Sequence, residues 1–411
     1  MAIFRSAKIL LPKDQDLSKW AVIACDQFTS EPEYWQRVAA ACENTPSAYH
    51  MILPEVLLEQ NTQPMIERIH RTMTRYLQDG LLNEYPDAYV YVERTMENGM
   101  IRKGLVGMID LEEYDYFPGS TSRIRATEQT VLERIPPRVK VRENAPLEYP
   151  HVLVLCDDEK RTLIEPLAEN KDQLHKLYDF DLMEGGGHIC GWLVTGEQAE
   201  AVDIRFRAYA SRTVSKYADM DGADVLLAVG DGNHSLATAK RCYEAKKESD
   251  PDLSLKDHPA RYALVELENI HDPAISFEAI HRILTEVNVE KLLDQLQSLC
   301  AEDGFPVMYT TGTEQGTLLL DRRRGELAVT VLQEFLDTWL ENNPGKIDYI
   351  HGEETAATLA KQENAVAFLL PTIEKNQLFR GVISRGVLPR KTFSMGHARE
   401  KRYYLEGRRI K

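Results

Sequence analysis

The sequence has little cysteine and no paired cysteine motif. Its 411 residues include six cysteines, which are scattered along the chain and never stand at C-x-x-C spacing. This distribution argues against a disulfide scaffold and against a structural zinc site built on such pairs. The amino terminus lacks the long apolar segment of a secretion signal, and no later run reaches the length of a membrane span. We therefore expect a soluble protein of a reducing compartment, most simply the cytoplasm.

Basic residues are in the minority. The chain has 49 Lys and Arg against 65 Asp and Glu, a formal net charge of −16. Because nucleic-acid binding depends on Lys and Arg contacts with phosphates, this balance disfavours a nucleic-acid partner. Internal repeats, low-complexity tracts and flexible linkers are also missing. We expect one unit over 1–411, with a subdivision near 281–304 into an N-terminal core and a C-terminal α/β portion.

Helical and strand-like patterns alternate along the chain. Helices are predicted at 34–42, 55–81, 127–134, 197–209, 289–300 and 330–342, and strands at 89–92, 103–109, 151–156, 187–194, 261–267, 306–310 and 316–320. A strand–turn–helix unit is predicted at 223–247, followed by a loop at 248–258. This mixture favours an α/β to α+β fold with a mixed sheet flanked by helices.

The most informative stretch is the strand-to-helix turn at 225–240. An apolar run ends at two glycines, and a helix-prone segment follows. The turn carries Gly230, Asp231, Gly232, Asn233, His234 and Ser235. Glycines allow the backbone to approach a ligand, and a helix N-terminus attracts anions. The adjacent carboxylate and imidazole also suit proton transfer or metal binding. The alternative is that these residues only form a turn and cap a helix.

Two basic stretches are candidate anion sites. Arg123 and Arg125 precede Thr127 and Glu128, and arginine is a multidentate donor for phosphate. Further along, Arg138, Lys140 and Arg142 alternate with valines, which predicts a strand with one positively charged face. Ordinary surface ion pairs would explain both stretches equally well. A third basic segment, at 388–396 with basic neighbours up to 409, predicts only solubility unless the fold brings it to the glycine turn.

Other candidate sites have weaker support. The three glycines at 185–187 would form a hairpin turn or a backbone cradle for a ligand. Asp26 and Gln27 lie at a second strand-to-helix junction and could reach a ligand, whereas Cys25 beside them is expected to be an inert core thiol. The eleven histidines form no clear metal set. Magnesium held by carboxylates and a phosphate ligand is the most plausible metal.

Several motifs together resemble the domain-of-unknown-function 1015 family over nearly the whole chain. They are the segments at 24–30, 125–128, 134–139, 230–235 and 401–406. Many members of that family have Asp-Gly-His-His-Arg where this chain has Asp231–Ser235, and that motif is similar to the phosphate-contacting turn of the ParB/sulfiredoxin superfamily. The likeness implies a nucleotide phosphate near 230–235 and a ParB/sulfiredoxin-like core. Ser235 replaces the arginine, so Arg123, Arg125 or Arg138 would have to supply the missing charge.

The leading hypothesis is a protein that binds a nucleotide or a phosphorylated metabolite, and specifically a small-molecule phosphotransferase using ATP or another nucleotide with magnesium. Backbone N–H groups at 232–234 would hold a phosphate, and Arg125 or Arg138 would offset negative charge. Asp231 or His234 would act as base, and Glu128 could hold magnesium. The alternatives are a non-catalytic nucleotide- or anion-sensing module, a ParB-like nucleic-acid-associated protein and a purely structural protein.

Overall fold

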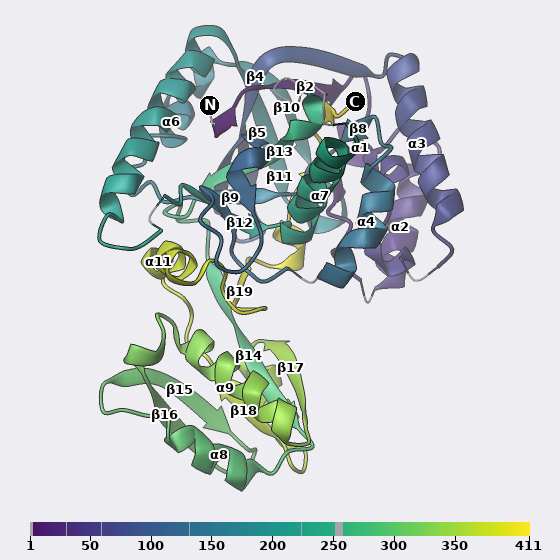
Figure 1. Cartoon of the computed structure of the whole chain (residues 1–411). Coiled ribbons are helices and arrows are strands. Elements are labelled where there is room, and N and C mark those ends of the chain that lie inside the picture. Colours follow the sequence, from purple (N-terminus) through teal and green to yellow (C-terminus); the bar gives the residue numbers. More distant parts are fainter. Residues whose placement is uncertain (1–2, 30, 59, 131, 223, 251–257) are drawn as a thin grey trace.

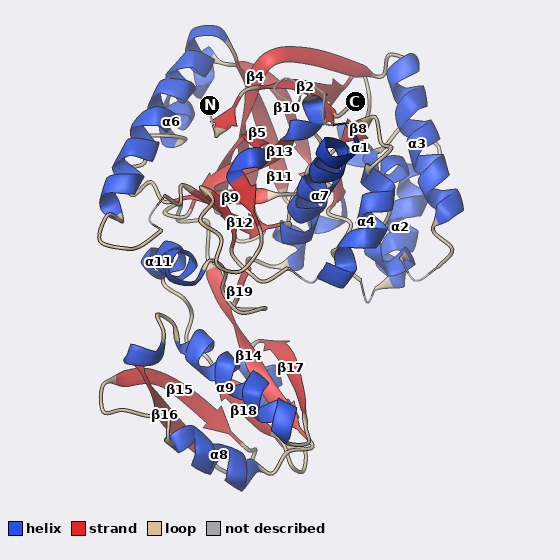
Figure 2. Ribbon diagram, in the orientation of Figure 1, coloured by secondary structure: helices blue, strands red, loops and turns tan. Residues whose placement is uncertain are grey.

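The chain forms a larger and a smaller β-sheet, each covered by helices (Figures 1 and 2). The computed structural model describes residues 3–29, 31–58, 60–130, 132–222, 224–250 and 258–411. Within these residues the larger sheet has 11 strands and the smaller has 6. The predicted mixed sheet flanked by helices is confirmed. The subdivision expected near 281–304 and the ParB/sulfiredoxin-like core both stay predictions.

The larger sheet has the strand order β10-β11-β4-β5-β13-β9-β12-β7-β6, with β1 beside β5 and β2 beside β4. Its strands are β1 (Phe4–Arg5), β2 (Ala7–Pro12), β4 (Leu82–Thr95), β5 (Ile101–Asp110), β6 (Tyr114–Asp115), β7 (Ile124–Ala126), β9 (Leu153–Cys156), β10 (His175–Asp181), β11 (His188–Val194), β12 (Leu227–Asp231) and β13 (Tyr262–Asn269). The central strands β13 and β9 run parallel and are buried along their whole length, as expected for strands covered on both faces.

The smaller sheet has the strand order β16-β15-β18-β14-β17, with β19 also paired to β14. Its strands are β14 (Phe277–Thr285), β15 (Gly304–Thr310), β16 (Gln315–Asp321), β17 (Lys346–His351), β18 (Val366–Leu369) and β19 (Phe393–Met395). The chain then returns to the larger part, where β20 (Tyr403–Tyr404) pairs with β3 (Val22–Ile23) and β21 (Arg408–Arg409) pairs with β8 (Leu147–Glu148).

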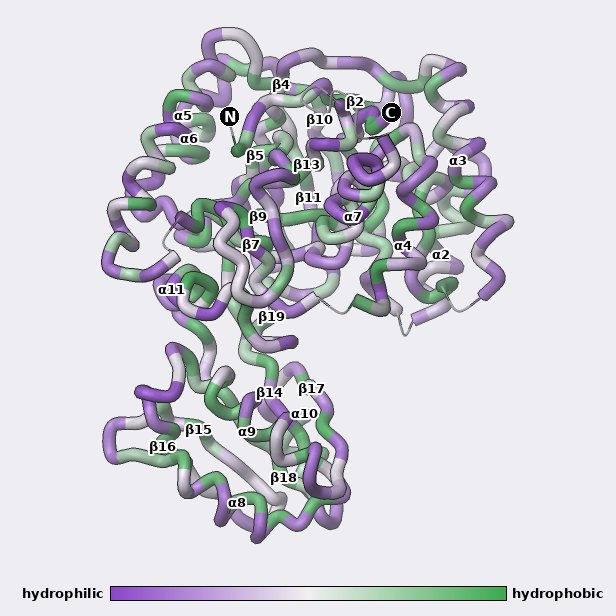
Figure 3. The backbone as a smooth tube through the Cα atoms, in the orientation of Figure 1, coloured by the Kyte–Doolittle hydropathy of each residue, from purple (hydrophilic) through white to green (hydrophobic). Residues whose placement is uncertain are grey.

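The helices cover the sheets through amphipathic faces; α3 and α8, for example, alternate between hydrophilic and hydrophobic colours in Figure 3. Their bounds are α1 (Leu17–Trp20), α2 (Pro32–Cys42), α3 (Gln63–Gln78), α4 (Ile135–Arg142), α5 (Glu165–Glu169), α6 (Gly196–Lys216), α7 (Asn233–Ser249), α8 (Val289–Gln297), α9 (Ala328–Asn342), α10 (Glu353–Leu359) and α11 (Lys375–Arg385). Among the described helices, none is both long and apolar enough to traverse a lipid bilayer.

The side chains of β4 point alternately into two separate apolar clusters in the larger part. Tyr89 and Tyr91 join the apolar cluster that contains Phe206 of α6, whereas Val90 and Val92 join the cluster that contains α2 and α3. Successive side chains of a strand point to opposite faces, so β4 contributes to both layers. A third cluster joins Leu155 of β9 to α11 and to the smaller sheet, so apolar packing is continuous between the two parts.

Two predicted elements near the basic stretches are wrong. The described residues of 127–134 form no α-helix, because Thr127 and Gln129 exchange backbone hydrogen bonds with Leu388 and only a short 3-10 helix, η4 (Leu132–Arg134), follows. The strand expected at 138–142 is the helix α4. Its prolines stand at the first helical positions, where no N–H partner is needed, so they start a helix rather than interrupt one.

Other predictions differ mainly at their ends. The helix predicted at 55–81 begins as α3 at Gln63, after a 3-10 helix η2 (Glu55–Leu57), and it ends beside Gly80 as expected. The strand–turn–helix unit is confirmed as β12 and α7, although position 223 lies outside the described residues. Positions 251–257 of the loop predicted at 248–258 also lie outside them.

Buried ion pairs attach the C-terminal segment to the larger sheet. Arg402 is 2% exposed, and its Nε lies 2.8 Å from Oε2 of Glu266 on β13. Its Nη2 donates to Glu406, and its Nη1 donates to the carbonyl of Tyr403 at 2.8 Å. A guanidinium in a low-dielectric interior requires counter-charges and acceptors of this kind, so these contacts fix the position of the segment.

Replacing Arg402 should destabilise the protein strongly. In Arg402→Met the carboxylates of Glu266 and Glu406 lose their buried counter-charge, and we expect a loss of about 3–5 kcal/mol in the free energy of unfolding. The matched control is Arg409→Met, whose exposed pair with Glu84 at 3.0 Å should contribute less than about 1 kcal/mol. Chemical denaturation of both variants measures the difference, and equal losses would contradict the anchoring role of Arg402.

Candidate functional site

A cavity of about 1090 Å³ lies where the two sheets meet. The larger part supplies the turn after β3, η2, the 128–138 region and the β12–α7 turn, while the smaller part supplies β14, β17 and the segment after α11. Its principal polar lining residues are Asp26, Gln27, Glu55, Glu128, Arg134, Arg138, Asp231, Asn233, His234, Glu278, Tyr349, His351, Arg390, Lys391, Ser394, His397 and Lys401.

The glycine turn shapes one wall of this cavity. Gly232 precedes α7 with φ +81°, a conformation that residues with side chains rarely adopt. A Cβ atom there would lie 2.8 Å from the carbonyl oxygen of His151, and one at Gly230 would lie 2.7 Å from Sδ of Met395. Both glycines are therefore required for close packing. The N-terminal end of α7 consequently opens into the cavity, where its N–H groups and dipole favour an anion.

The C-terminal basic segment also lines the cavity. Lys401 Nζ lies 3.5 Å from Oδ2 of Asp231 and donates to the carbonyl of Met395 at 2.9 Å. The backbone N–H of Thr392 donates to Oε1 of Glu128 at 3.2 Å. These contacts bring cations from the chain's end to carboxylates of the 128 and 231 regions. The basic segment therefore belongs to the site and is more than a solubilising surface.

Arg282 on β14 holds this segment from the side of the smaller sheet. Its guanidinium is fully buried and donates to the carbonyls of Lys391 at 2.8 Å and Arg390 at 3.1 Å. It also donates to Oε1 of Gln333 at 2.9 Å. Because the carbonyls of 390 and 391 point to Arg282, the position of the Lys391 side chain at the cavity wall depends on the smaller sheet.

His234 is held in its neutral form. Burial, together with the positive charges of Arg138 and Arg134, lowers the pKa of His234 to about 4. The imidazole is therefore neutral at physiological pH and can exchange a hydrogen bond with a ligand without carrying charge.

The carboxylates of the cavity differ in their acidity. Burial raises the pKa of Glu128, an effect that the charge of Lys391 partly offsets. Burial acts in the same direction on Asp26, but there the charge of His151, a hydrogen bond from Gln27 and the charge of Lys401 outweigh it and lower the pKa. Asp26 is accordingly the stronger acid. The cavity therefore offers carboxylates with separated proton affinities, a feature of acid–base sites.

The fold brings together most of the residues predicted for the site. Gly230, Asp231, Gly232, Asn233, His234, Glu128 and Arg138 all line the cavity. Ser235 faces a smaller neighbouring pocket instead.

The structure does not bring Arg123 and Arg125 to the cavity. Arg123 pairs with Glu113 at 2.5 Å, and Arg125 is buried with its guanidinium donating to the carbonyls of Ser122 and Gly222 at 2.9 and 2.8 Å. Both arginines are used by the packing around β7. Arg138 is thus the arginine, of the three proposed, that lies beside the turn.

Two further cavity residues, Tyr349 and His351 of β17, were not predicted from the sequence. They are alternate residues of an ordinary strand, and they belong to no recognisable motif. The glycines at 185–187 form the turn between β10 and β11, and the cavity lining does not include them. Burial raises the pKa of Cys25 to about 12, so this thiol is a poor nucleophile at neutral pH.

Two clusters with metal-ligand chemistry occur among the described residues, and neither lines the cavity. One consists of Asp157, Glu159 and His271, and the other of Asp179, His188 and Cys190. Within the cavity, carboxylates such as Glu128 and Asp231 are oxygen ligands of the kind that magnesium prefers.

The fold and cavity define a mixed α/β protein with a polar cleft between two sheets. The chain belongs to the family described as protein of unknown function (DUF1015), whose model matches residues 6–371. The comparison with curated proteins gave no match.

Several solved structures are partly similar. A free serine kinase in complex with AMP has 9% identity and a TM-score of 0.38, with 74% of this chain and 91% of that chain covered. SbnI with a C-terminal truncation, from Staphylococcus aureus, has 11% identity and a TM-score of 0.36, with coverage of 71% and 82%. A conserved hypothetical protein from Pyrococcus furiosus has 10% identity and a TM-score of 0.35, with coverage of 71% and 90%.

Acid should weaken the fold through His234. Because the folded state holds the neutral ring, the unfolded chain takes up the proton first as the pH falls below 6.5, so stability is lost between pH 6.5 and about 4. His234→Gln should remove this part of the pH dependence, on the order of 1–3 kcal/mol. Denaturation at a series of pH values measures it.

Arg138→Met should raise the pKa of His234 without restoring it to 6.5, because burial, the larger cause, remains. Titration of the His234 Cε1–H signal by NMR measures the midpoint. A midpoint unchanged in Arg138→Met would show that Arg138 does not act on this ring.

Proposed function

We propose that the cavity binds a nucleotide or a phosphorylated metabolite. The observation that carries this proposal is that the N-terminus of α7 and the side chains of Lys391, Lys401 and Arg138 line one cavity, although they come from three distant parts of the chain. A helix N-terminus together with converging cations is a common arrangement for phosphate recognition. The buried Oδ1 of Asn233 has no hydrogen-bond partner among the described residues, and it adds an acceptor beside this helix end for a hydroxyl of the ligand.

The charge balance of the cavity supports an anionic ligand. The lining contains five cations, Arg134, Arg138, Arg390, Lys391 and Lys401, and five carboxylates, Asp26, Glu55, Glu128, Asp231 and Glu278. This even balance stands in a chain whose net charge is −16. The cavity lining is therefore less acidic than the chain as a whole, so it disfavours an anion less than the average surface of this protein does.

We further propose transfer of a phosphoryl group to a small hydroxyl compound. The acceptor oxygen would form a bond to phosphorus as the bond from phosphorus to the leaving phosphate oxygen breaks, and the hydroxyl proton would pass to Asp231. Lys391 and Arg138 would offset negative charge on the transferred group, as positioning and charge stabilisation require. Neutral His234 would orient the hydroxyl, and Glu128 would supply an oxygen ligand if magnesium accompanies the nucleotide.

Binding is tested by calorimetry with ATP, ADP and inorganic phosphate, each with and without magnesium. Lys391→Met should weaken phosphate-ligand binding about tenfold, the value of one charge-assisted contact of about 1.4 kcal/mol. The matched control is Lys361→Met, an exposed lysine that does not line the cavity, and its affinity should be unchanged. If none of these ligands binds the wild-type chain, the proposal fails.

Transfer is tested with Asp231→Asn, which keeps the shape of the side chain but removes its basicity. Turnover of ATP in the presence of small hydroxy compounds should fall at least about a hundredfold, the usual contribution of a general base. Nucleotide affinity should stay within a few fold of the wild-type value. Binding without turnover in the wild-type protein would overturn the transferase proposal and leave a nucleotide- or anion-sensing module.

A further inference from the structure

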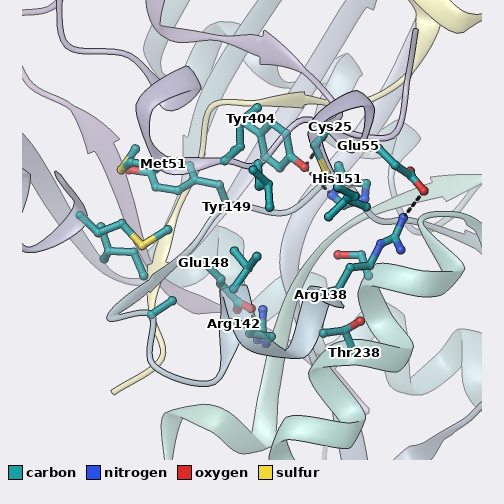
Figure 4. Close-up of a pocket in the computed structure, with 18 residues that line it drawn as sticks. Cys25, Met51, Glu55, Arg138, Arg142, Glu148, Tyr149, His151, Thr238 and Tyr404 are labelled. Atoms are coloured by element: carbon teal, nitrogen blue, oxygen red, sulfur yellow. Dashed lines mark hydrogen bonds and ion pairs between the residues drawn. The ribbon is translucent and has the colours of Figure 1, made fainter. Parts of the chain in front are cut away.

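A second, smaller pocket adjoins the cavity. It has a volume of about 130 Å³ and lies between α4, α7 and the segment at 147–151 (Figure 4). Most of its wall is apolar, and the residues that form this part are Met51, Ile52, Leu53, Leu58, Met73, Val141, Ala145 and Leu147. A preformed apolar pocket with few polar groups is the usual form of a site for a small organic group.

An ion pair separates this pocket from the cavity. Glu55 Oε1 lies 2.7 Å from Nη2 of Arg138, and both residues line both spaces. Figure 4 shows this pair at one end of the pocket and Met51 at the other. The two spaces are therefore neighbours that share one charged boundary.

The polar side chains that line the pocket include the ion pair of Arg142 with Glu148 and the hydroxyl-bearing Tyr149 and Tyr404. The hydroxyl of Tyr149 is buried without a hydrogen-bond partner among the described residues, and the whole side chain is 8% exposed. A buried hydroxyl without a partner is costly, so a ligand atom that hydrogen-bonds to it gains affinity. In contrast, the Tyr404 hydroxyl is already engaged, with Nδ1 of His151 at 2.9 Å.

The position of the pocket along α7 matches a ligand with two parts. Ser235 and Thr238 line the pocket, whereas Asn233 lines the cavity. With a rise of 1.5 Å per residue, Thr238 lies about 7.5 Å along the helix axis from Asn233. This offset is about the length of a sugar that joins a phosphate to a ring.

We propose that the pocket receives an aromatic ring of the ligand whose phosphate lies at the N-terminus of α7. The inference rests on the proposed phosphate-binding function and narrows the ligand class to phosphate esters that carry a flat, heteroatom-containing ring, such as a purine nucleotide. Thioethers of Met51 and Met73 pack well against aromatic rings. The Arg138 guanidinium can stack on a ring face, and the Tyr149 hydroxyl can bind a ring nitrogen.

The experiment compares ATP with inorganic tripolyphosphate, which has the phosphates but no ring. The wild-type protein should bind ATP at least ten times more tightly than tripolyphosphate. Ala145→Leu places a larger side chain at a buried pocket wall and should lower ATP affinity about tenfold without changing tripolyphosphate affinity. Ala41→Leu, on the exposed surface of α2, is the matched control and should change neither.

Tyr149→Phe is a second test variant for the case in which Ala145→Leu folds poorly. It removes only one hydroxyl, so its fold should stay intact. It should weaken ATP binding several fold and leave the affinity for tripolyphosphate unchanged. Equal wild-type affinity for the two ligands, unchanged in both variants, would overturn the ring pocket while the phosphate site stands. Failure of both ligands to bind the wild-type chain would instead overturn the proposed function itself.

Discussion

The buried guanidinium of Arg402 fixes the segment on which the cavity depends. It links Glu266 of the central strand β13 to Glu406, and Lys401 immediately before it reaches Asp231. This anchor acts together with the pairing of β20 with β3 and of β21 with β8, which also holds the C-terminal residues against the larger part. Since a buried charge tolerates few alternative geometries, the ion pairs define position even where their net contribution to stability is small.

A second buried arginine completes the arrangement from the other sheet. Arg282 on β14 binds the carbonyls of Lys391 and Arg390, so the segment between 390 and 402 is held at one end by the smaller sheet and at the other by the larger. Its lysines reach the cavity between these two anchors. Any movement of one sheet relative to the other would therefore change the spacing of the cations around a ligand.

Local patterns in the sequence identified the turn but not its partners. The apolar run and glycines before Asn233 predict a strand, a turn and a helix from adjacent residues, and the structure has all three. Glu128 was expected in a helix, yet its backbone lies beside Leu388, a pairing between residues 260 positions apart that no local pattern encodes. The position of the segment around Lys391 depends in the same way on long-range hydrogen bonds, from Arg282 to its carbonyls and from the Thr392 N–H to Glu128. Such tertiary contacts override the helix propensity of a local sequence.

The conformation of α4 decides what Arg138 can do. In a strand, the alternating residues Arg138, Lys140 and Arg142 would all point to one face. In a helix, residues four apart share a face, so Arg138 and Arg142 point to the same side and Lys140 points away from it. Arg138, Val141 and Arg142 accordingly line the pocket, while Lys140 is exposed. The prolines at the start of α4 impose this choice, because they fit the first turn of a helix. Pro136 and Pro137 thus place one guanidinium between a polar cavity and an apolar pocket, where it can contact both parts of one ligand.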